Sequence, residues 1–171
     1  SFITKEKSVA LYAALVSFGT YVFIFGFRKS FTVCTFEGMT FGPIAFKTAM
    51  VISQMLGYLM AKFYGIKFIS GLEKKNRYKI IFLLTGIAWA AWLLFAIVPA
   101  PYSILFLFIN GFPLGMLWGV VFSYVEGRRS TDFIGAALAV SFIFSAGWVK
   151  SVGAWLMLHF HIAETWVPFC T

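Results

Sequence analysis

Charged residues are scarce in this 171-residue sequence, and acidic residues most of all. Only 12% of the residues are charged, and 6 Asp and Glu stand against 14 Lys and Arg. Soluble domains carry about 25% charged and about 45–50% apolar residues, whereas 61% of this chain is hydrophobic and its mean hydropathy is +0.89. A soluble core cannot bury several apolar runs of about 20 residues, which is the length that crosses a bilayer. The composition therefore indicates an integral membrane protein surrounded by lipid.

Other scarce residues exclude further classes of protein. Cys34 and Cys170 are too few and too far apart for a disulfide framework. His159 and His161 have no third ligand nearby, and zinc takes three or four protein ligands, so we expect no metal and no cofactor. The sequence shows no nucleophile with a base and no phosphate-binding glycine loop, so we expect no enzyme activity. The net charge of +8 follows membrane topology and does not indicate nucleic acid binding.

The apolar runs predict an all-α fold, a polytopic membrane helix bundle with five complete spans and the start of a sixth. The expected spans are residues 8–31, 43–61, 80–98, 102–125 and 133–158, and the sixth opens at Trp166. Pro43 is expected at the opening of the second helix, where its missing N–H costs little. Residues 62–79 are expected to form a basic loop between the second and third spans.

Basic residues gather in loops that this topology places on one side of the membrane. Lys5 and Lys7, the 62–79 stretch with its single acid Glu73, and the loop with Arg128 and Arg129 all fall on that side. Because cytoplasmic loops carry an excess of Lys and Arg, we place the N-terminus in the cytoplasm. The expected location is a bacterial inner membrane.

Every charge within an expected span is positive, namely Arg28, Lys29, Lys47 and Lys150, and we expect Lys29 to be a membrane anchor. A cation at the centre of a membrane helix costs about 2.5–3.5 kcal/mol on insertion scales unless it finds a partner, water or an anion. We expect Arg28 and Lys150 to contact an anionic solute, although Arg28 also lies near the span end, where a membrane anchor would lie. Lys47, close to the start of its helix, has an equal claim to reach outward to water.

Two groups of uncharged residues in the spans have candidate roles. The amides Gln54 and Asn110 are candidate solute contacts, with hydrogen bonding to a neighbouring helix as the alternative. Gly111, Gly115 and Gly119 recur at every fourth position and therefore share one helix face. Small residues at this spacing predict close packing against another helix.

Two short motifs carry a resemblance to a known family. The first span has Phe25, Arg28, Lys29 and Phe31, and the fourth has GFPLGMLW from Gly111 to Trp118. Both resemble helices of the organophosphate:phosphate antiporters in the major facilitator superfamily. The resemblance implies that residues 1–171 are the N-terminal half-bundle of a twelve-helix transporter whose C-terminal half is missing. It also implies that Arg28 faces a central cavity and holds the substrate phosphate.

The sequence departs from that family at two positions. Ala61 stands where the superfamily has an Asp in the loop after the second helix, and Gly147 stands where the antiporters have a cavity His. We expect secondary active transport of a small anionic solute, organophosphate-like or a carboxylate, by alternating access. The alternative is a membrane sensor or scaffold that kept the fold without transport, and the change at Ala61 favours it.

Overall fold

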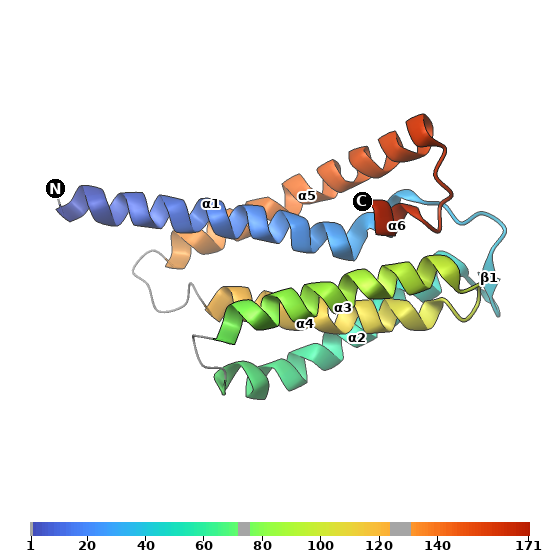
Figure 1. The fold of residues 1–171 in the computed structure, drawn as a ribbon, viewed down its shortest axis with the longest axis horizontal. Helices are drawn as coiled ribbons and strands as arrows, with labels where there is room; N and C mark the ends of the chain where they lie inside the picture. Colours follow the sequence, from blue (N-terminus) through green and yellow to red (C-terminus); the bar gives the residue numbers. More distant parts are fainter. Residues whose placement is uncertain (1, 72–75, 124–130) are drawn as a thin grey trace.

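The computed structural model describes residues 2–71, 76–123 and 131–171, and this part of the chain is mainly helical (Figure 1). Its long helices are α1 (Phe2–Lys29), α2 (Phe46–Ser70), α3 (Arg77–Ile97), α4 (Ile104–Ser123) and α5 (Thr131–Phe160). Two short helices, η1 (Ser30–Val33) and α6 (Val167–Cys170), follow α1 and α5.

Four segments are long and apolar enough to cross a membrane, which confirms a membrane-embedded helical protein. They are Ser8–Val33, Arg77–Ile97, Ile104–Ser123 and Asp132–Phe160. Helix α2 is not among them, since Lys47, Gln54 and Lys62 interrupt its apolar residues. The fifth span therefore stays a prediction.

The start of α2 differs from its prediction. A two-stranded hairpin precedes the helix, with β1 (Thr40–Phe41) antiparallel to β2 (Ile44–Ala45). Gly42 and Pro43 form its two-residue turn, and Gly42 has a φ of +59°. A positive φ at the first turn position favours glycine, so these residues close a hairpin. The prediction that Pro43 opens the second helix was wrong, because the helix begins at Phe46.

The end of α2 also differs from its prediction. The helix continues to Ser70, so Lys62 and Lys67 lie on it and the expected 62–79 loop was wrong. The reason is a stripe of small buried residues, Gly57, Ala61 and Gly65, that keeps its spacing of four past the expected helix end. Ala61 is therefore a buried helix residue and does not occupy a loop position.

The boundaries of α1, α3, α4 and α5 lie within a few residues of the predictions. Two predicted loops lie only partly within the described residues. Residues 72–75 and 124–130 lie outside the described residues, and with them Glu73, Arg128 and Arg129. The side chains of Lys5 and Lys7 lie outside the described part as well.

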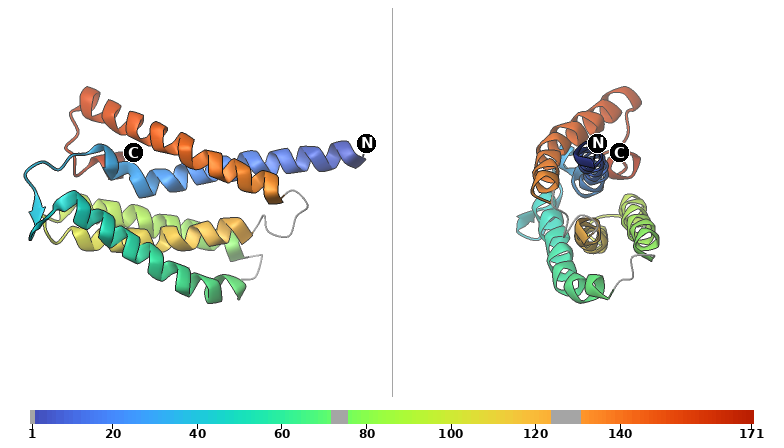
Figure 2. Two further views of the ribbon diagram at one scale, coloured as in Figure 1. Left: turned by 180° about the vertical axis from the view of Figure 1, so that it is seen from behind. Right: turned by 90° about the vertical axis from the view of Figure 1, so that its left-hand side faces the viewer.

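The helices form two rows, which the end-on view in Figure 2 shows most clearly. In one row α1 lies between α5 and α6, and in the other α4 lies between α2 and α3. The most extensive contacts join α2 to α4, α1 to α5 and α3 to α4, while α6 touches α3, α5 and η1. Helices α1 and α4 are thus the central members of their rows.

Helices α2 and α4 approach each other closely because glycines face each other across the contact. A Cβ atom added to Gly57 would lie closer than 3.0 Å to the carbonyl oxygen of Phe108, and one added to Gly111 equally close to that of Gln54. No Cβ fits at such a distance from a rigid backbone atom. Each helix therefore needs a glycine at this level.

The two other glycines of the predicted stripe lie further along the same contact. A Cβ on Gly115 would lie 2.7 Å from Ala61 Cβ and 2.9 Å from the carbonyl oxygen of Tyr58. A Cβ on Gly119 would meet only the flexible side chain of Ile69. The contact is therefore tightest at Gly111 and loosens toward Gly119.

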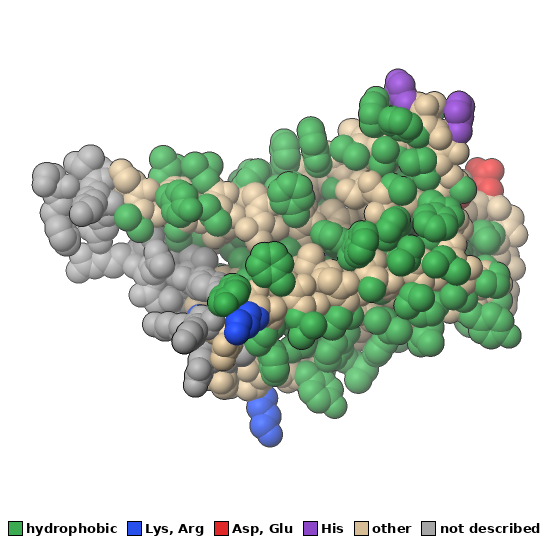
Figure 3. Space-filling model, viewed as in Figure 1, with side chains coloured by type: hydrophobic (Ala, Val, Ile, Leu, Met, Phe, Trp, Pro, Cys, Tyr) green, Lys and Arg blue, Asp and Glu red, His purple; other side chains and the backbone are tan. Residues whose placement is uncertain are grey.

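The surface of the bundle has the distribution expected of a membrane protein. Figure 3 shows hydrophobic side chains over the middle of one face, with Lys and Arg near one end and Asp and Glu near the other. Large apolar side chains are strongly exposed there and elsewhere, among them Phe23 at 73%, Phe82 at 76% and Ile143 at 79%. Such wide apolar exposure suits lipid contact.

Candidate functional site

Two cations from different parts of the chain meet at one aromatic ring. The guanidinium carbon of Arg28, on α1, lies 4.4 Å from the centre of the Tyr58 ring on α2. Lys62, one turn after Tyr58, places its ammonium 4.9 Å from the same ring and 4.1 Å from the ring of Trp118 on α4. Cation–π contacts are worth about 0.5–2 kcal/mol, depending on desolvation. They position both cations without neutralising them.

The Arg28 side chain is incompletely satisfied. Its Nε atom is buried and makes no hydrogen bond within the described part of the chain. The acids whose side chains the structure describes are Glu37, Asp132 and Glu164, which lie in loops or at the start of α5. A buried charged donor without an acceptor costs about 1–3 kcal/mol or more. An anion beside Arg28 would supply the acceptor atoms.

The backbone of Arg28 is fixed by a relay of two buried amides. Gln54 Nε2 donates to the carbonyl oxygen of Arg28 and to Asn110 Oδ1, each at 2.9 Å. Asn110 Nδ2 in turn donates to the carbonyl oxygen of Ala88 at 3.0 Å. The relay joins α1, α2, α4 and α3. The structure thus places both predicted solute contacts in helix–helix hydrogen bonds.

Side chains of α2 and α3 also satisfy the carbonyls at the end of α1 and η1, which have no partner inside the helix. Trp92 Nε1 donates to the carbonyl oxygen of Phe27 at 2.6 Å. Lys47 Nζ donates to those of Thr32 and Cys34 at 2.9 and 2.7 Å. Lys47 therefore lies at the end of η1, where it holds the chain turn after α1.

Lys150, the other predicted cation, lies beside the same end of α1. A Cβ on Gly26 would lie 3.6 Å from Val149 Cγ2, and one on Gly153 2.7 Å from Val33 Cγ1. Residues 26–33, which form the end of α1 and η1, therefore run alongside residues 149–153 of α5. The exposed Lys150 and the half-buried Lys29 lie at this level, and Lys29 is within electrostatic range of both Arg28 and Lys150.

Aromatic rings fill the region of α1 and α5 next to these cations. Tyr21 packs edge-on against Phe142, with ring centres 4.8 Å apart, and Phe25 does so at 5.7 Å. Tyr21 is buried and lies beside both Tyr58 and Arg28. A row of aromatic rings thus begins at Tyr58, beside Arg28 and Lys62, and continues through Tyr21 and Phe142 to Phe25.

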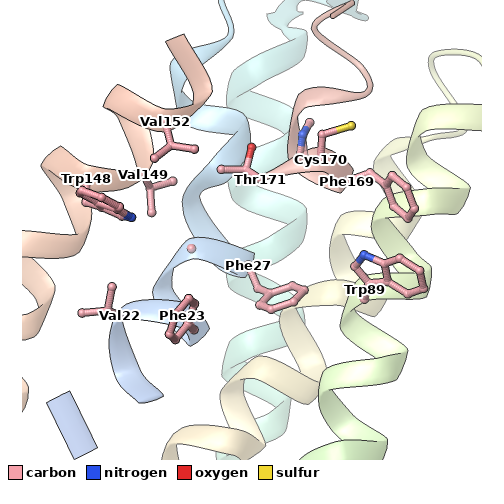
Figure 4. Close-up of a pocket in the computed structure, with 12 residues that line it drawn as sticks. Val22, Phe23, Phe27, Trp89, Trp148, Val149, Val152, Phe169, Cys170 and Thr171 are labelled. Carbon is pink, nitrogen blue, oxygen red and sulfur yellow. The ribbon is translucent and has the colours of Figure 1, made fainter. Parts of the chain in front are cut away.

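An apolar pocket of about 240 Å³ lies on the other side of the contact between α1 and α5 (Figure 4). Its walls come from α1, α3, α5 and α6, and none of the lining side chains is charged. They include Phe23, Phe27, Trp89, Trp148 and Phe169. Arg28 and the apolar pocket therefore lie on opposite sides of α1.

A carboxylate ties the end of α1 to the segment after α5. Glu164 accepts hydrogen bonds from the backbone N–H of Phe36 at 2.8 Å and from the N–H and hydroxyl of Thr35 at 3.2 and 3.1 Å. Desolvation raises the pKa of Glu164, but these hydrogen bonds and the nearby Lys47 outweigh it, so the pKa is lowered overall. The carboxylate is therefore charged at neutral pH.

The thiol of Cys34 lies in the same network. Its Sγ donates to the carbonyl oxygen of Glu164 at 3.4 Å. Burial, assisted by the negative charge of Glu164, raises the pKa of Cys34 to about 12 against the weaker opposing effect of Lys47. The thiol is therefore neutral and poorly reactive at physiological pH.

Sequence reasoning missed Tyr58, Lys62, Trp118 and Tyr21 as parts of the cationic site. It placed Lys62 in a loop, and it treated Lys29 as a membrane anchor. The available signal was the spacing of Tyr58 and Lys62, because residues four apart share a helix face once α2 extends past them. Which helix carries the facing Trp118 cannot be read from local spacing.

The fold and the site define a polytopic membrane protein with clustered cations on its helices. The chain belongs to DUF5690, a family of unknown function whose model matches residues 30–171. Tyr58, Lys62, Trp118 and Lys150 lie inside the matched range, and Arg28 and Lys29 lie just before it. Neither the curated proteins nor the solved structures contain a match to the chain.

Proposed function

We propose that this protein binds a small anionic solute and carries it across the membrane, with Arg28 as the central contact. The observation that carries the proposal is the Arg28 guanidinium, which shares the Tyr58 ring with Lys62 while its buried Nε lacks a hydrogen-bond partner in the described chain. Cations within membrane helices are rare and mark solute pathways. Lys150 supplies further positive charge at the same end of α1.

The arrangement of the helices supports alternating access as the mechanism. The two rows of Figure 2 correspond to each other, with α1 matching α4, α5 matching α2 and α6 matching α3. The contact of α1 with α5 then corresponds to that of α4 with α2. Facilitator-type halves are built from such three-helix repeats, packed around a site near the bilayer midplane.

Residues 1–171 would then form one six-helix half of a twelve-helix transporter, with α2 as a fifth span and α6 as the start of a sixth. The second half and the cytoplasmic N-terminus, in a bacterial inner membrane, follow from the resemblance to the facilitator superfamily and from the basic loops. Rocking of the two halves about the bound anion would expose the site to each side in turn.

The scarcity of acids in the helices favours exchange of one anion for another over proton coupling. Asp132 is the only acid in the four apolar segments, and it occupies the first position of its segment. Helix α2 has none along its length. These helices therefore offer no protonatable carboxylate near the site.

Uptake by proteoliposomes tests the proposal. The full natural chain is reconstituted, loaded with phosphate, and supplied with radiolabelled phosphate, sugar phosphates or dicarboxylates. Arg28→Gln and Lys62→Gln are expected to lower uptake at least about tenfold, the effect of losing one charge-assisted contact. Lys67→Gln is the matched control, because Lys67 lies exposed on the same helix.

Two outcomes would overturn the assignment in different ways. Unchanged uptake in Arg28→Gln would show that this residue is not the solute contact. Anion binding without uptake of any of these solutes would point instead to the sensor or scaffold that the sequence left as the alternative.

A further inference from the structure

We infer that the solute carries two separate anionic groups, one for each of two cation pairs that the helices hold on one side of α1. This inference rests on the proposed function, since it names the class of solute bound at the proposed site. It adds a second subsite, formed by Lys29 and Lys150, to the subsite formed by Arg28 and Lys62.

The first subsite is fixed by aromatic rings. Arg28 and Lys62 both lie within 5 Å of the centre of the Tyr58 ring, at 4.4 and 4.9 Å. Trp118 holds the Lys62 ammonium from the other helix of the contact at 4.1 Å. An anionic group placed here meets a guanidinium with an unused buried N–H and an ammonium with free donors.

The second subsite follows from helix register. Phe25 and Phe142 touch across α1 and α5 with ring centres 5.7 Å apart. Lys29 lies one turn after Phe25 and continues its row, while Lys150 directly follows Val149, which faces Gly26 of α1. Both helices run in the same direction here, since Gly26 faces Val149 and Val33 faces Gly153.

The same register separates this subsite from the apolar pocket of Figure 4. Trp148 lines that pocket, and Lys150, two residues later, points about 200° away around the helix. Lys150 is exposed, so its ammonium is free to turn toward Lys29 or toward a solute. The electrostatic interaction between Lys29 and Lys150 places the two charges in the same neighbourhood.

The directions of the side chains favour one anionic group for each pair. Arg28 and Lys29 are adjacent in α1, so their side chains diverge by about 100°, toward α2 and toward α5. Glu37, Asp132 and Glu164, the acids whose side chains the structure describes, form no ion pair with any of the four cations, so each pair is open to a negative charge on the solute. Phe25 and Phe142 lie about one and two turns before Lys29 and Lys150, and their half-buried rings suit contact with the uncharged part of such a molecule.

Equilibrium binding by the full natural chain in lipid nanodiscs tests this inference. The probes are two matched pairs, n-propylphosphonate with propane-1,3-bisphosphonate and butyrate with glutarate. The compound with two anionic groups is expected to bind about tenfold more tightly than its partner in at least one pair, the gain of one further charge-assisted contact.

The variants separate the two subsites. Lys150→Gln is expected to remove the advantage of the second anionic group while leaving the affinity for the single-group compound within about twofold. Arg28→Gln should weaken both compounds. Lys67→Gln removes the same charge from an exposed site on α2 and should change neither affinity, which controls for the net charge of the protein. Because Lys150 is exposed, its variant should fold like the natural protein.

Equal affinity for both members of each pair, or equal loss of both in Lys150→Gln, would overturn the two-group inference and leave the anion proposal standing. If none of the four probes bound the well-folded natural chain, the inference and the proposed function would both be contradicted.

Discussion

Replacing Gly111 by Ala should pull α2 and α4 apart, because the added methyl group has no room. Its Cβ would lie closer than 3.0 Å to the carbonyl oxygen of Gln54, inside the about 3.3–3.6 Å of a close C···O contact. The obstacle is backbone, so no side-chain rotation relieves it. The helices must shift, and the shift strains the 2.9 Å hydrogen bonds of Gln54 to Arg28 and Asn110.

Two opposing effects determine the expected loss in the free energy of unfolding. Overpacking of a tight contact costs about 1–3 kcal/mol, and Ala regains up to about 1 kcal/mol over Gly through helix propensity. A net destabilisation of about 1–2 kcal/mol follows for Gly111→Ala. Gly119→Ala should lose less, because the methyl group there meets only the side chain of Ile69, which can turn away.

Gly86 provides the matched control. It lies exposed in α3, and a Cβ added there meets nothing within 4 Å. Gly86→Ala should therefore be neutral or stabilising by up to about 1 kcal/mol. Reversible unfolding in mixed micelles, followed by tryptophan fluorescence, measures all three variants. If Gly111→Ala were as stable as Gly86→Ala, the close contact of α2 with α4 would be refuted.

Polar contacts at the end of α1 lead to three more expected outcomes. Asn110→Leu leaves a buried donor of Gln54 unpaired and should cost about 0.6–1.7 kcal/mol in the same unfolding assay; a double variant with Gln54→Leu should recover part of it, and no loss in the single variant would contradict the relay. Because the pKa of Glu164 is lowered on folding, its contribution is complete above the ordinary value of 4.5 and is lost as pH falls through the folded value. At neutral pH the natural protein should therefore be more stable than Glu164→Gln by less than about 1 kcal/mol, and the two should become equally stable in acid. A stability difference that does not change with pH would argue against the hydrogen bonds of Glu164 to Thr35 and Phe36. Maleimide at neutral pH should label the exposed Cys170 well before the buried Cys34, whose pKa is raised to about 12, and equal rates would contradict the burial of Cys34.

The long apolar runs were enough to predict α1, α3, α4 and α5, because a membrane helix needs only length and hydropathy to be recognised. The boundaries of α2 escaped prediction for two physical reasons. Pro43 suits both a helix start and a turn, and the adjacent Gly42 with its positive φ decided for the hairpin. Lys62 suggested a loop, although its ammonium lies over aromatic rings of α2 and α4.

The candidate site was only partly visible in the sequence. Arg28 and Lys150 stood out as charges in apolar runs, but Tyr58 became relevant only once the structure placed α2 beside α1. The amides of Gln54 and Asn110 were candidates for solute contact or for hydrogen bonds to a neighbouring helix, and the structure shows hydrogen bonds between helices. These pairings join residues 56 and 22 positions apart, so local patterns cannot reveal them.

The melting temperature of the purified full natural chain, measured against rising concentrations of phosphate, sugar phosphates and carboxylates, tests the anion site most directly. A ligand that binds only the folded state raises the melting temperature by mass action. At one hundred times its Kd, it adds about 2.7 kcal/mol to the free energy of unfolding. We predict such a rise with at least one anion, and its loss in Arg28→Gln but not in Lys67→Gln. The account would be contradicted if the natural protein melted cooperatively at the same temperature in every anion. It would also be contradicted if the melting temperature of Arg28→Gln rose as much as that of the natural protein.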